Sequence, residues 1–228
     1  ELVAQSSPPG LVAYFPLEET SGSTVANEIA ADNCGAIAGK LSSAEGRLGR
    51  ALEFDGTTHV AAGDVGAFEG DQAFSSSVWI YPTGRDVSTV LSKMDEANAF
   101  RGYDVILEGN KVSTHFVHHW PDRGFNVGTK SPIKLDAWHH LAVTYDGSRE
   151  AKGVRIYVDG QVQELDILTN HKLDGSLLTD KSFHIGTRGT SAPFQGRIDE
   201  VRLYAKALTP EEVTLLSKGE TLDGLKSN

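Results

Sequence analysis

The sequence predicts an all-β protein, a two-sheet antiparallel jelly-roll sandwich with one short C-terminal helix. Short segments in which apolar and polar residues alternate recur along the chain, as expected of strands that bury one face. Turn signals, many of them Asp-Gly pairs, separate these segments. About a dozen short strands at this spacing, with no helix-period pattern among them, indicate two packed antiparallel sheets.

The expected strands follow one another between turn signals. They lie in the segments RALEFDG, FSSSVWIYP, YDVILEGNKVSTHFV, WHHLAVTYDG, GVRIYVDGQVQEL, KSFHIGT and GRIDEVRLY. The third segment contains Gly109-Asn110, a strong signal for a hairpin turn. A hairpin that turns there places Tyr103 opposite a residue near position 116 and Arg101 opposite one near position 118.

One helix is predicted, in the segment LTPEEVTLLSKG. Thr209 caps it, Pro210 takes its first position, Glu212 completes a capping box and Gly219 ends it. Three parts of the chain follow from these assignments. Residues 1–9 are a linker-like N-terminal segment, residues 10–219 form the jelly-roll domain, and residues 220–228 are a C-terminal tail.

Composition limits the class of partner. The formal net charge is −10 at pH 7, whereas nucleic acids and anionic membranes attract basic surfaces. We therefore expect no nucleic-acid partner. No apolar run reaches the roughly 18 residues of a spanning helix, so no membrane insertion is expected. Cys34 is the single cysteine, which excludes an internal disulfide and a cysteine-based zinc site.

Six sequence blocks, in a fixed order, carry a family resemblance. They are GLVAYFPLEETSGSTVANE, ALEFDGTTHV, FSSSVWIYP, WHHLAVTYDG, VRIYVDG and GRIDEVRLYAKALTPEEV. Together they resemble the laminin-G-like, concanavalin-A-like jelly-roll superfamily in its bacterial branch, over residues 10–218. The block SKMDEANAFRGYDVILEGNKVSTHFVHHWPDRG more narrowly resembles jelly rolls within large secreted bacterial proteins that carry cytochrome-c-like domains. The resemblance implies carbohydrate recognition most often, calcium frequently, and glycoside hydrolysis in some branches.

Action as a glycoside hydrolase or lyase is the least supported function. The family's catalytic motif is Glu-x-Asp-x-Glu, and retaining enzymes need two carboxylates about 5–5.5 Å apart. The nearest match here, Glu164 and Asp166, has Leu168 at the third position. A zinc site is also disfavoured, because His115 and His119 lie roughly 13 Å apart on an extended strand. The sequence therefore predicts a protein that is not an enzyme.

The segment HFVHHWPDRGF is the candidate ligand site. Trp120 lies where the strand alternation ends, and an exposed indole can stack on the apolar face of a sugar ring. Polar side chains around it can hydrogen-bond with hydroxyls or carboxylates. The alternative is that Trp120 covers an edge of the core. The predicted ligand-binding residues are Trp120, Arg101, Tyr103, His115, His118, Arg123, Asp95 and Asn98.

Asp55 and Asp199 are candidate ligands of a structural Ca²⁺. Asp199 is in phase with inward-pointing apolar residues of its strand, and a buried carboxylate is costly unless a cation or several donors satisfy it. The family resemblance implies calcium ligands in the FDG block, which holds Asp55, and in the IDEV block, which holds Asp199. The alternative is that Asp199 forms a buried salt bridge with Arg197 or Arg202.

The leading hypothesis is a non-catalytic carbohydrate-binding module that docks a larger secreted bacterial protein onto a polysaccharide or oligosaccharide. Its expected location is secreted, periplasmic or at the bacterial cell surface. The near-neutral middle segment leaves an acidic glycan open as the ligand. The alternative is a protein-interaction or packing domain that contacts other domains of a parent protein, because an exposed aromatic beside arginine also suits a protein interface.

Overall fold

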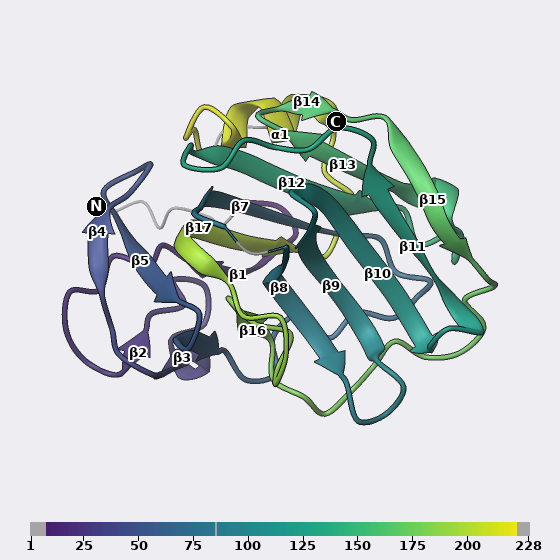
Figure 1. Cartoon of the computed structure of the whole chain (residues 1–228), viewed down its shortest axis with the longest axis horizontal. Coiled ribbons are helices and arrows are strands. Elements are labelled where there is room, and N and C mark those ends of the chain that lie inside the picture. The colour runs from purple at the N-terminus through teal and green to yellow at the C-terminus, as the bar shows by residue number, and fades with distance from the viewer. Residues whose placement is uncertain (1–7, 85, 223–228) are drawn as a thin grey trace, which may run out of the picture.

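Two antiparallel sheets face each other across an apolar core in the computed structural model, which describes residues 8–84 and 86–222 (Figure 1). The predicted sandwich and its C-terminal helix are confirmed. Residues 1–7 of the linker-like segment and residues 223–228 of the tail lie outside the described residues.

The first sheet has eight strands within the described residues, in the order β14-β13-β12-β7-β17-β5-β4, with β1 pairing beside β17. Its strands are β1 (Leu11–Phe15), β4 (Ser43–Glu45), β5 (Arg50–Asp55), β7 (Phe74–Pro82), β12 (His139–Tyr145), β13 (Val154–Val158), β14 (Gln161–Val162) and β17 (Gln195–Tyr204). The short 3-10 helix η2 (Ala151–Gly153) precedes β13.

The second sheet has nine strands in the same part of the chain, in the order β15-β11-β10-β9-β8-β16-β6-β3-β2. Its strands are β2 (Thr24–Val25), β3 (Gly35–Ala38), β6 (His59–Ala61), β8 (Val87–Asp95), β9 (Arg101–Glu108), β10 (Lys111–His119), β11 (Arg123–Thr129), β15 (Leu165–Asn170) and β16 (His184–Ile185). The 3-10 helix η1 (Ala31–Asn33) precedes β3. In Figure 1 the teal strands β8 to β11 lie in front of β7, β12 and β17.

The hairpin between β9 and β10 has the predicted register. Glu108 lies opposite Lys111, and Tyr103 lies opposite Phe116. Because side chains alternate along a strand, Tyr103 and Phe116 face the core together. There they approach the ring of Phe74 on β7, with ring centroids 4.9 and 5.6 Å from it. Such aromatic pairs add to the stabilisation that burial of apolar area provides.

The helix α1 (Pro210–Leu216) packs on the outer face of the eight-stranded sheet. Thr209 and Glu212 form the predicted capping box, which satisfies backbone N–H groups at the helix start. Val213 and Leu216 of the helix pack with Tyr157 of β13 in a second apolar cluster. The outer face of the nine-stranded sheet is on the opposite side of the sandwich, and it carries the candidate site.

Candidate functional site

A row of polar residues crosses the outer face of the nine-stranded sheet. His115 and Asp104 occupy the alternate positions to the core-facing residues of β10 and β9, so they point away from the core. His115 lies opposite Asp104 on one side and Asn126 on the other. Asp104 in turn lies opposite Ser92. The row therefore runs through β11, β10, β9 and β8.

Asp104 is the centre of this row and is completely buried. Its Oδ1 accepts hydrogen bonds from the backbone N–H of His115 at 3.0 Å and from His115 Nδ1 at 2.9 Å. Its Oδ2 accepts from Nε and Nη2 of Arg188, at 3.0 and 2.7 Å. Burial raises the pKa of Asp104, but the interactions with His115 and Arg188 outweigh burial and hold that pKa below its ordinary value. Asp104 therefore places a negative charge at the base of the site, and the guanidinium balances it.

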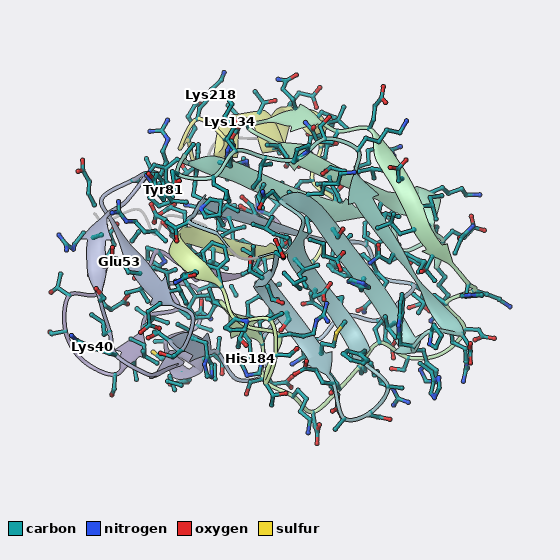
Figure 2. The ribbon with its side chains drawn as sticks, in the orientation of Figure 1. Lys40, Glu53, Tyr81, Lys134, His184 and Lys218 are labelled. Carbon is teal, nitrogen blue, oxygen red and sulfur yellow. The ribbon has the colours of Figure 1, made fainter. Side chains whose placement is uncertain are left out.

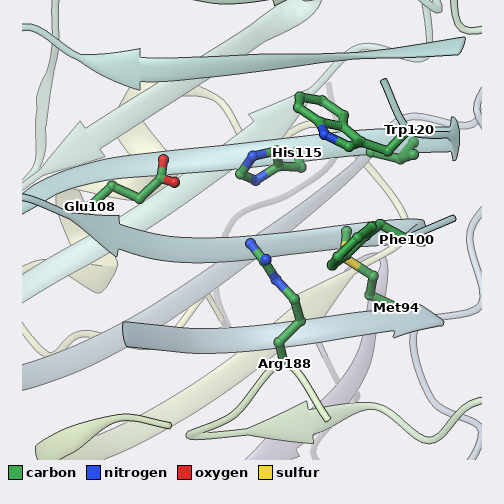
Figure 3. A pocket seen from close by; sticks show the side chains of 7 residues that line it. Met94, Phe100, Glu108, His115, Trp120 and Arg188 are labelled. Atoms are coloured by element: carbon green, nitrogen blue, oxygen red, sulfur yellow. The ribbon is translucent and has the colours of Figure 1, made fainter. Parts of the chain in front are cut away.

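A pocket with a volume of about 220 Å³ lies over this network. Its lining residues are Met94, Phe100, Glu108, His115, Val117, Trp120 and Arg188. Figure 3 shows Trp120, Phe100 and Met94 at one end and Glu108 at the other, with His115 and Arg188 between the ends. The indole of Trp120 and the ring of His115 meet nearly at right angles, with centroids 5.4 Å apart. The pocket therefore has one apolar end and one polar end.

The turn between β8 and β9 brings Phe100 into the pocket. Ala99 and Phe100 both have a left-handed backbone, with φ of 50° and 58°. This conformation is uncommon outside glycine, and such backbone strain is often found at functional sites. The Arg188 guanidinium lies over the Phe100 ring at 5.7 Å, within range of a cation–π interaction. The backbone N–H of Trp120 donates to the Ala99 carbonyl at 2.8 Å, which joins this turn to the end of β10.

Glu96, in the same turn, holds the loop that supplies Arg188. The Glu96 carboxylate accepts hydrogen bonds from the backbone N–H and the hydroxyl of Thr190, both at 2.7 Å, and from the hydroxyl of Ser191. Burial raises the pKa of Glu96, but these hydrogen bonds outweigh burial and hold it below its ordinary value. Ser92 Oγ also donates to the Arg188 carbonyl at 3.0 Å. Two loops far apart in sequence are thus fixed against each other beside the pocket.

Glu108 differs from the other carboxylates of the site, because its side chain has no partner among the described residues. It is partly buried, it lines the pocket, and it forms no side-chain hydrogen bond or ion pair with any described residue. Lys111 lies opposite it on β10, but no ion pair joins the two side chains among the described residues. Arg188 uses Nε and Nη2 on Asp104, so its Nη1 stays available. The polar end therefore offers both an acceptor and a donor for a ligand.

Two of the predicted ligand-binding residues, Trp120 and His115, line the pocket. Asp95 and Asn98 lie close to it in sequence, at the end of β8 and in the turn that leads to Phe100, but they do not line it. Asn98 is exposed, and the carboxylate of Asp95 lies 4.0 Å from the ammonium group of Lys181.

Tyr103 is buried in the core, with 5% of its surface exposed. Its hydroxyl donates to the carbonyl of Gly66 at 2.7 Å. This placement corrects the expectation that Tyr103 contacts a ligand. The register was predicted correctly, but strand alternation directs Tyr103 inward and its neighbour Asp104 outward.

Arg101, His118 and Arg123 take part in a different group of contacts. Arg101 Nε donates to the His118 carbonyl at 3.4 Å, and His118 Nδ1 donates to the Ser176 carbonyl at 2.8 Å. Arg123 Nε donates to Asp174 Oδ1 at 2.6 Å. His118 and Arg123 contact the loop around 174–176, whereas Arg101 contacts the His118 carbonyl. None of the three is among the residues that line the pocket, and their contact with a ligand stays a prediction.

Asp55 and Asp199 do not approach each other. In the pairing of β5 with β17, Asp55 lies opposite Gln195, and four strand residues separate Gln195 from Asp199 by about 13 Å. Asp55 is exposed, and its Oδ1 accepts three hydrogen bonds from Thr57 and Thr58, which hold the pKa of Asp55 well below its usual range. The two carboxylates therefore do not share one ion.

Asp199 is completely buried, but not in the core. A register shift between Asp199 and Arg202 places Asp199 opposite Trp79, on the outer face of the eight-stranded sheet. Its Oδ2 accepts from the backbone N–H groups of Arg47 and Leu48, at 2.8 and 3.0 Å. Two backbone donors thus satisfy this oxygen. The expected alternative salt bridges are also not formed, because Arg197 pairs with Glu53 and Arg202 with Glu200.

The residues present do not fit the expected calcium site. In the part of the chain that the structure describes, no group of three or more His, Cys, Asp or Glu side chains is arranged to hold a metal ion. Calcium binding by the chain stays a prediction.

A second depression, of about 430 Å³, lies on the eight-stranded sheet. Figure 2 shows three of its lining residues, Lys40, Glu53 and Tyr81, along the β4–β5 side of the molecule. Two of its charged groups, Arg197 and Glu53, are engaged with each other. Arg197 Nε lies 3.4 Å from Glu53, and the guanidinium lies over the Tyr81 ring at 5.3 Å. The pocket on the nine-stranded sheet, with its unpaired Glu108, is therefore the stronger candidate site.

Phe100, Glu108 and Arg188 are not among the ligand-binding residues predicted from the sequence. A signal for Glu108 was present, because a turn at Gly109-Asn110 and strand alternation place it on the same face of β9 as Asp104. No such signal existed for Arg188, which reaches the site from the loop after β16.

The arrangement of the strands defines a lectin-like β-sandwich domain. A family model described as the concanavalin A-like lectin/glucanases superfamily matches residues 54–214, which is more than half of the chain. The chain belongs to this superfamily, as the sequence blocks indicated. No helix in the described residues is long and apolar enough to cross a membrane.

Solved structures share this fold at low sequence identity. Domain 4 of AbnA, a GH43 extracellular arabinanase from Geobacillus stearothermophilus, solved in complex with arabinotriose, matches with a TM-score of 0.61 and 21% identity over 92% of this chain and 100% of that chain. The binding domain of Paraclostridial Mosquitocidal Protein 1 matches with a TM-score of 0.67 and 14% identity, and that of botulinum neurotoxin serotype D/C VPI 5993 with 0.66 and 11%. Each covers 92% of this chain, which spans 52% of those binding domains.

Proposed function

We propose that this domain is a non-catalytic carbohydrate-binding module that docks a larger secreted bacterial protein onto a polysaccharide. The observation that carries the proposal is the pocket over Asp104, where aromatic walls face a carboxylate and a guanidinium nitrogen that have no partner among the described residues. A sugar ring presents an apolar C–H face and a polar hydroxyl edge, and this pocket matches both.

The aromatic end suits the apolar face of a sugar. Trp120 and Phe100 line that end together with Met94 (Figure 3). Binding pockets combine apolar walls with a few converging polar groups that orient the ligand. Glu108 and Arg188 supply those polar groups here. The likeness to domain 4 of an extracellular arabinanase, solved with arabinotriose, supports the glycan class and a secreted parent protein.

The carboxylates near the pocket do not have the geometry of a glycoside hydrolase. Glu108 and Asp104 share a face of β9 but lie four residues apart, about 13 Å along an extended strand, whereas catalytic pairs lie about 5–9.5 Å apart. Asp104 is also buried and fully engaged with His115 and Arg188. Glu164 lies away from the pocket and pairs with Lys130 at 3.2 Å. These observations support binding without catalysis.

Affinity electrophoresis through gels that contain neutral or acidic polysaccharides tests the proposal. We expect at least one polysaccharide to retard the domain. Trp120→Ala should weaken that retention about tenfold or more, since a buried aromatic hot spot contributes upwards of about 2 kcal/mol. The melting temperature should change little, because Trp120 is partly exposed and lies outside the core.

Trp138→Ala is the matched control. Trp138 is also a partly exposed tryptophan, and it packs against Tyr81 beside the eight-stranded sheet, with ring centroids 5.7 Å apart. Retention should survive in this variant. Equal loss of retention in both variants, or the release of reducing ends during incubation, would contradict the proposed function.

A packing domain is the second candidate function, and one observation favours it. Within the part of the chain that the structure describes, the edge strand β15 pairs with β11 alone. It exposes Ile167 and Leu168, with 51% and 58% of their surfaces accessible. Exposed apolar edge strands are templates for pairing with another chain or domain. If no polysaccharide in a broad panel retards the domain, this candidate becomes the preferred one.

A further inference from the structure

We propose that the pocket binds a single uncharged sugar ring and excludes carboxylated sugars, with Glu108 as the residue that sets this selection. This inference rests on the proposed function and narrows the ligand class. It also rejects the acidic glycan that the sequence analysis left open. The charge balance of the pocket, its polarity from end to end and its size support this selection.

Among the residues that line the pocket, no cation is left without an ion-pair partner to balance a carboxylate on the ligand. Arg188 is the arginine that lines it, and both Nε and Nη2 are bound to Asp104, a completely buried carboxylate. His115 donates to the same carboxylate. Glu96 adds a further negative charge beside the Arg188 loop. Glu108 is then a negative charge at the pocket wall with no ion-pair partner among the described residues, although Lys111 lies opposite it on β10. Like charges in a partly desolvated site repel strongly.

The polar end is suited to hydroxyl groups. A hydroxyl both donates and accepts hydrogen bonds, whereas a carboxylate only accepts them. Glu108 offers an acceptor, and Arg188 Nη1 offers a donor. A pair of ring hydroxyls can therefore use both groups at once. A ligand carboxylate could use only the arginine and would leave Glu108 facing a second negative charge.

The opposite end is suited to the face of one ring. Trp120 and Phe100 lie at that end in Figure 3, while Glu108 lies at the other end. The volume of about 220 Å³ is below the roughly 300–1,000 Å³ of pockets that enclose a drug-sized ligand. The pocket therefore takes one ring, and the rest of a glycan chain stays outside it.

The experiment compares one polysaccharide before and after oxidation of its primary alcohols to carboxylates. A neutral polysaccharide that retards the domain is selected first, and its oxidised form is then tested at low ionic strength. We expect the oxidised form to bind at least tenfold more weakly to the unmodified protein. The difference in affinity between the neutral and the oxidised polysaccharide should become smaller as salt is added, because salt screens charge repulsion.

Glu108→Gln separates charge repulsion from lost hydroxyl contacts. The amide keeps the shape of the side chain and removes its charge, so the variant should bind the oxidised form more tightly than the parent does, and the neutral form a few-fold more weakly. Glu220→Gln is the matched control. Glu220 is exposed beyond helix α1, on the other side of the sandwich, so this variant has the same net charge without the change in the pocket.

The outcomes distinguish this inference from the proposed function. If the oxidised polysaccharide retards the domain as strongly as the neutral one, the inference is overturned and the proposed function stays in place. Unchanged selectivity in Glu108→Gln, or salt-independent selectivity in the parent protein, overturns the role of Glu108. Absence of retention by every polysaccharide overturns both. Because Glu108 has no partner among the described residues, a melting curve should show the variant folded.

Discussion

Asp104 and Asp199 are both completely buried, each on the outer face of a different sheet, and yet their pKa values move in opposite directions. Two basic side chains hydrogen-bond to Asp104 and lower its pKa. Burial dominates at Asp199 and raises its pKa to about 7, because its donors are backbone N–H groups and its Oδ1 has no hydrogen-bond partner in the structure.

The buried carboxylates of the two regions are therefore stabilised by different kinds of partner. Around Asp104 the charges are paired, and the neighbouring Glu108 is left free to face a ligand. Around Asp199 the surrounding groups include Trp79 and His140, both of which also have a buried nitrogen without a partner. Burial lowers the pKa of His140 to about 3. In the described residues, Asp199 has no basic side chain as a hydrogen-bond partner, whereas the Asp104 row has paired charges beneath a pocket that can hold a ligand.

Asp104→Asn should produce the largest change in the free energy of unfolding, and this change is a loss. The substitution leaves Arg188 beside a neutral amide, and removing one partner of a buried ion pair costs about 3–5 kcal/mol. Denaturant unfolding at pH 7 measures this loss. The difference from the parent should shrink as the pH falls below the ordinary carboxyl range, because the lowered pKa of Asp104 contributes stability only while the carboxyl is ionised.

Asp174→Asn is the control for that loss. Asp174 pairs with Arg123 in an exposed ion pair, with 51% and 45% of the two side chains accessible, and such pairs contribute little to stability. A similar, small change in both variants would mean that the Asp104 network does not stabilise the fold.

Asp199→Asn should change the free energy of unfolding by a smaller amount than Asp104→Asn does, and it should raise it instead of lowering it. The folded protein holds the Asp199 proton up to a pH of about 7, whereas the unfolded chain releases it near 3.8. Stability from this group is therefore present below pH 3.8 and is lost as the pH rises to about 7. The asparagine variant should exceed the parent by roughly 1–4 kcal/mol at pH 8 and match it near pH 4.

Urea unfolding of both proteins across this pH range measures the effect. Asp180→Asn supplies the control, because that aspartate side chain is 86% exposed and its loss should give no pH-dependent difference. If the difference in the free energy of unfolding between Asp199→Asn and the parent stays constant with pH, the raised pKa of Asp199 is contradicted.

The smallest effect is expected from removing calcium. The family resemblance predicts a structural ion at Asp55 and Asp199, but the geometry separates these carboxylates. We therefore expect exhaustive chelation to leave the melting temperature unchanged at pH 8, where Asp199 is ionised. A drop on chelation that calcium reverses, and that Asp199→Asn abolishes, would restore the calcium site.

Much of the fold could be predicted because the signals are local. Alternation along β7 placed Phe74, Val78 and Ile80 in the core, and Gly109-Asn110 set the register of the hairpin. The capping box of helix α1 was likewise visible within four residues. The candidate site was predicted only in part, because Trp120 and His115 lie in one segment while their pocket partners Phe100 and Arg188 come from two loops.

The sequence by itself determined the two sheets, their turns, the helix and the segment that carries the site, because periodicity and turn propensity act between near neighbours. Only the tertiary structure decided which carboxylate is paired and which is free. Asp104 is neutralised by an arginine from the loop after β16, Asp199 meets the turn around Arg47, and Glu108 meets no partner among the described residues. The order of strands in the sheets brings these distant segments together, and no local pattern records that order.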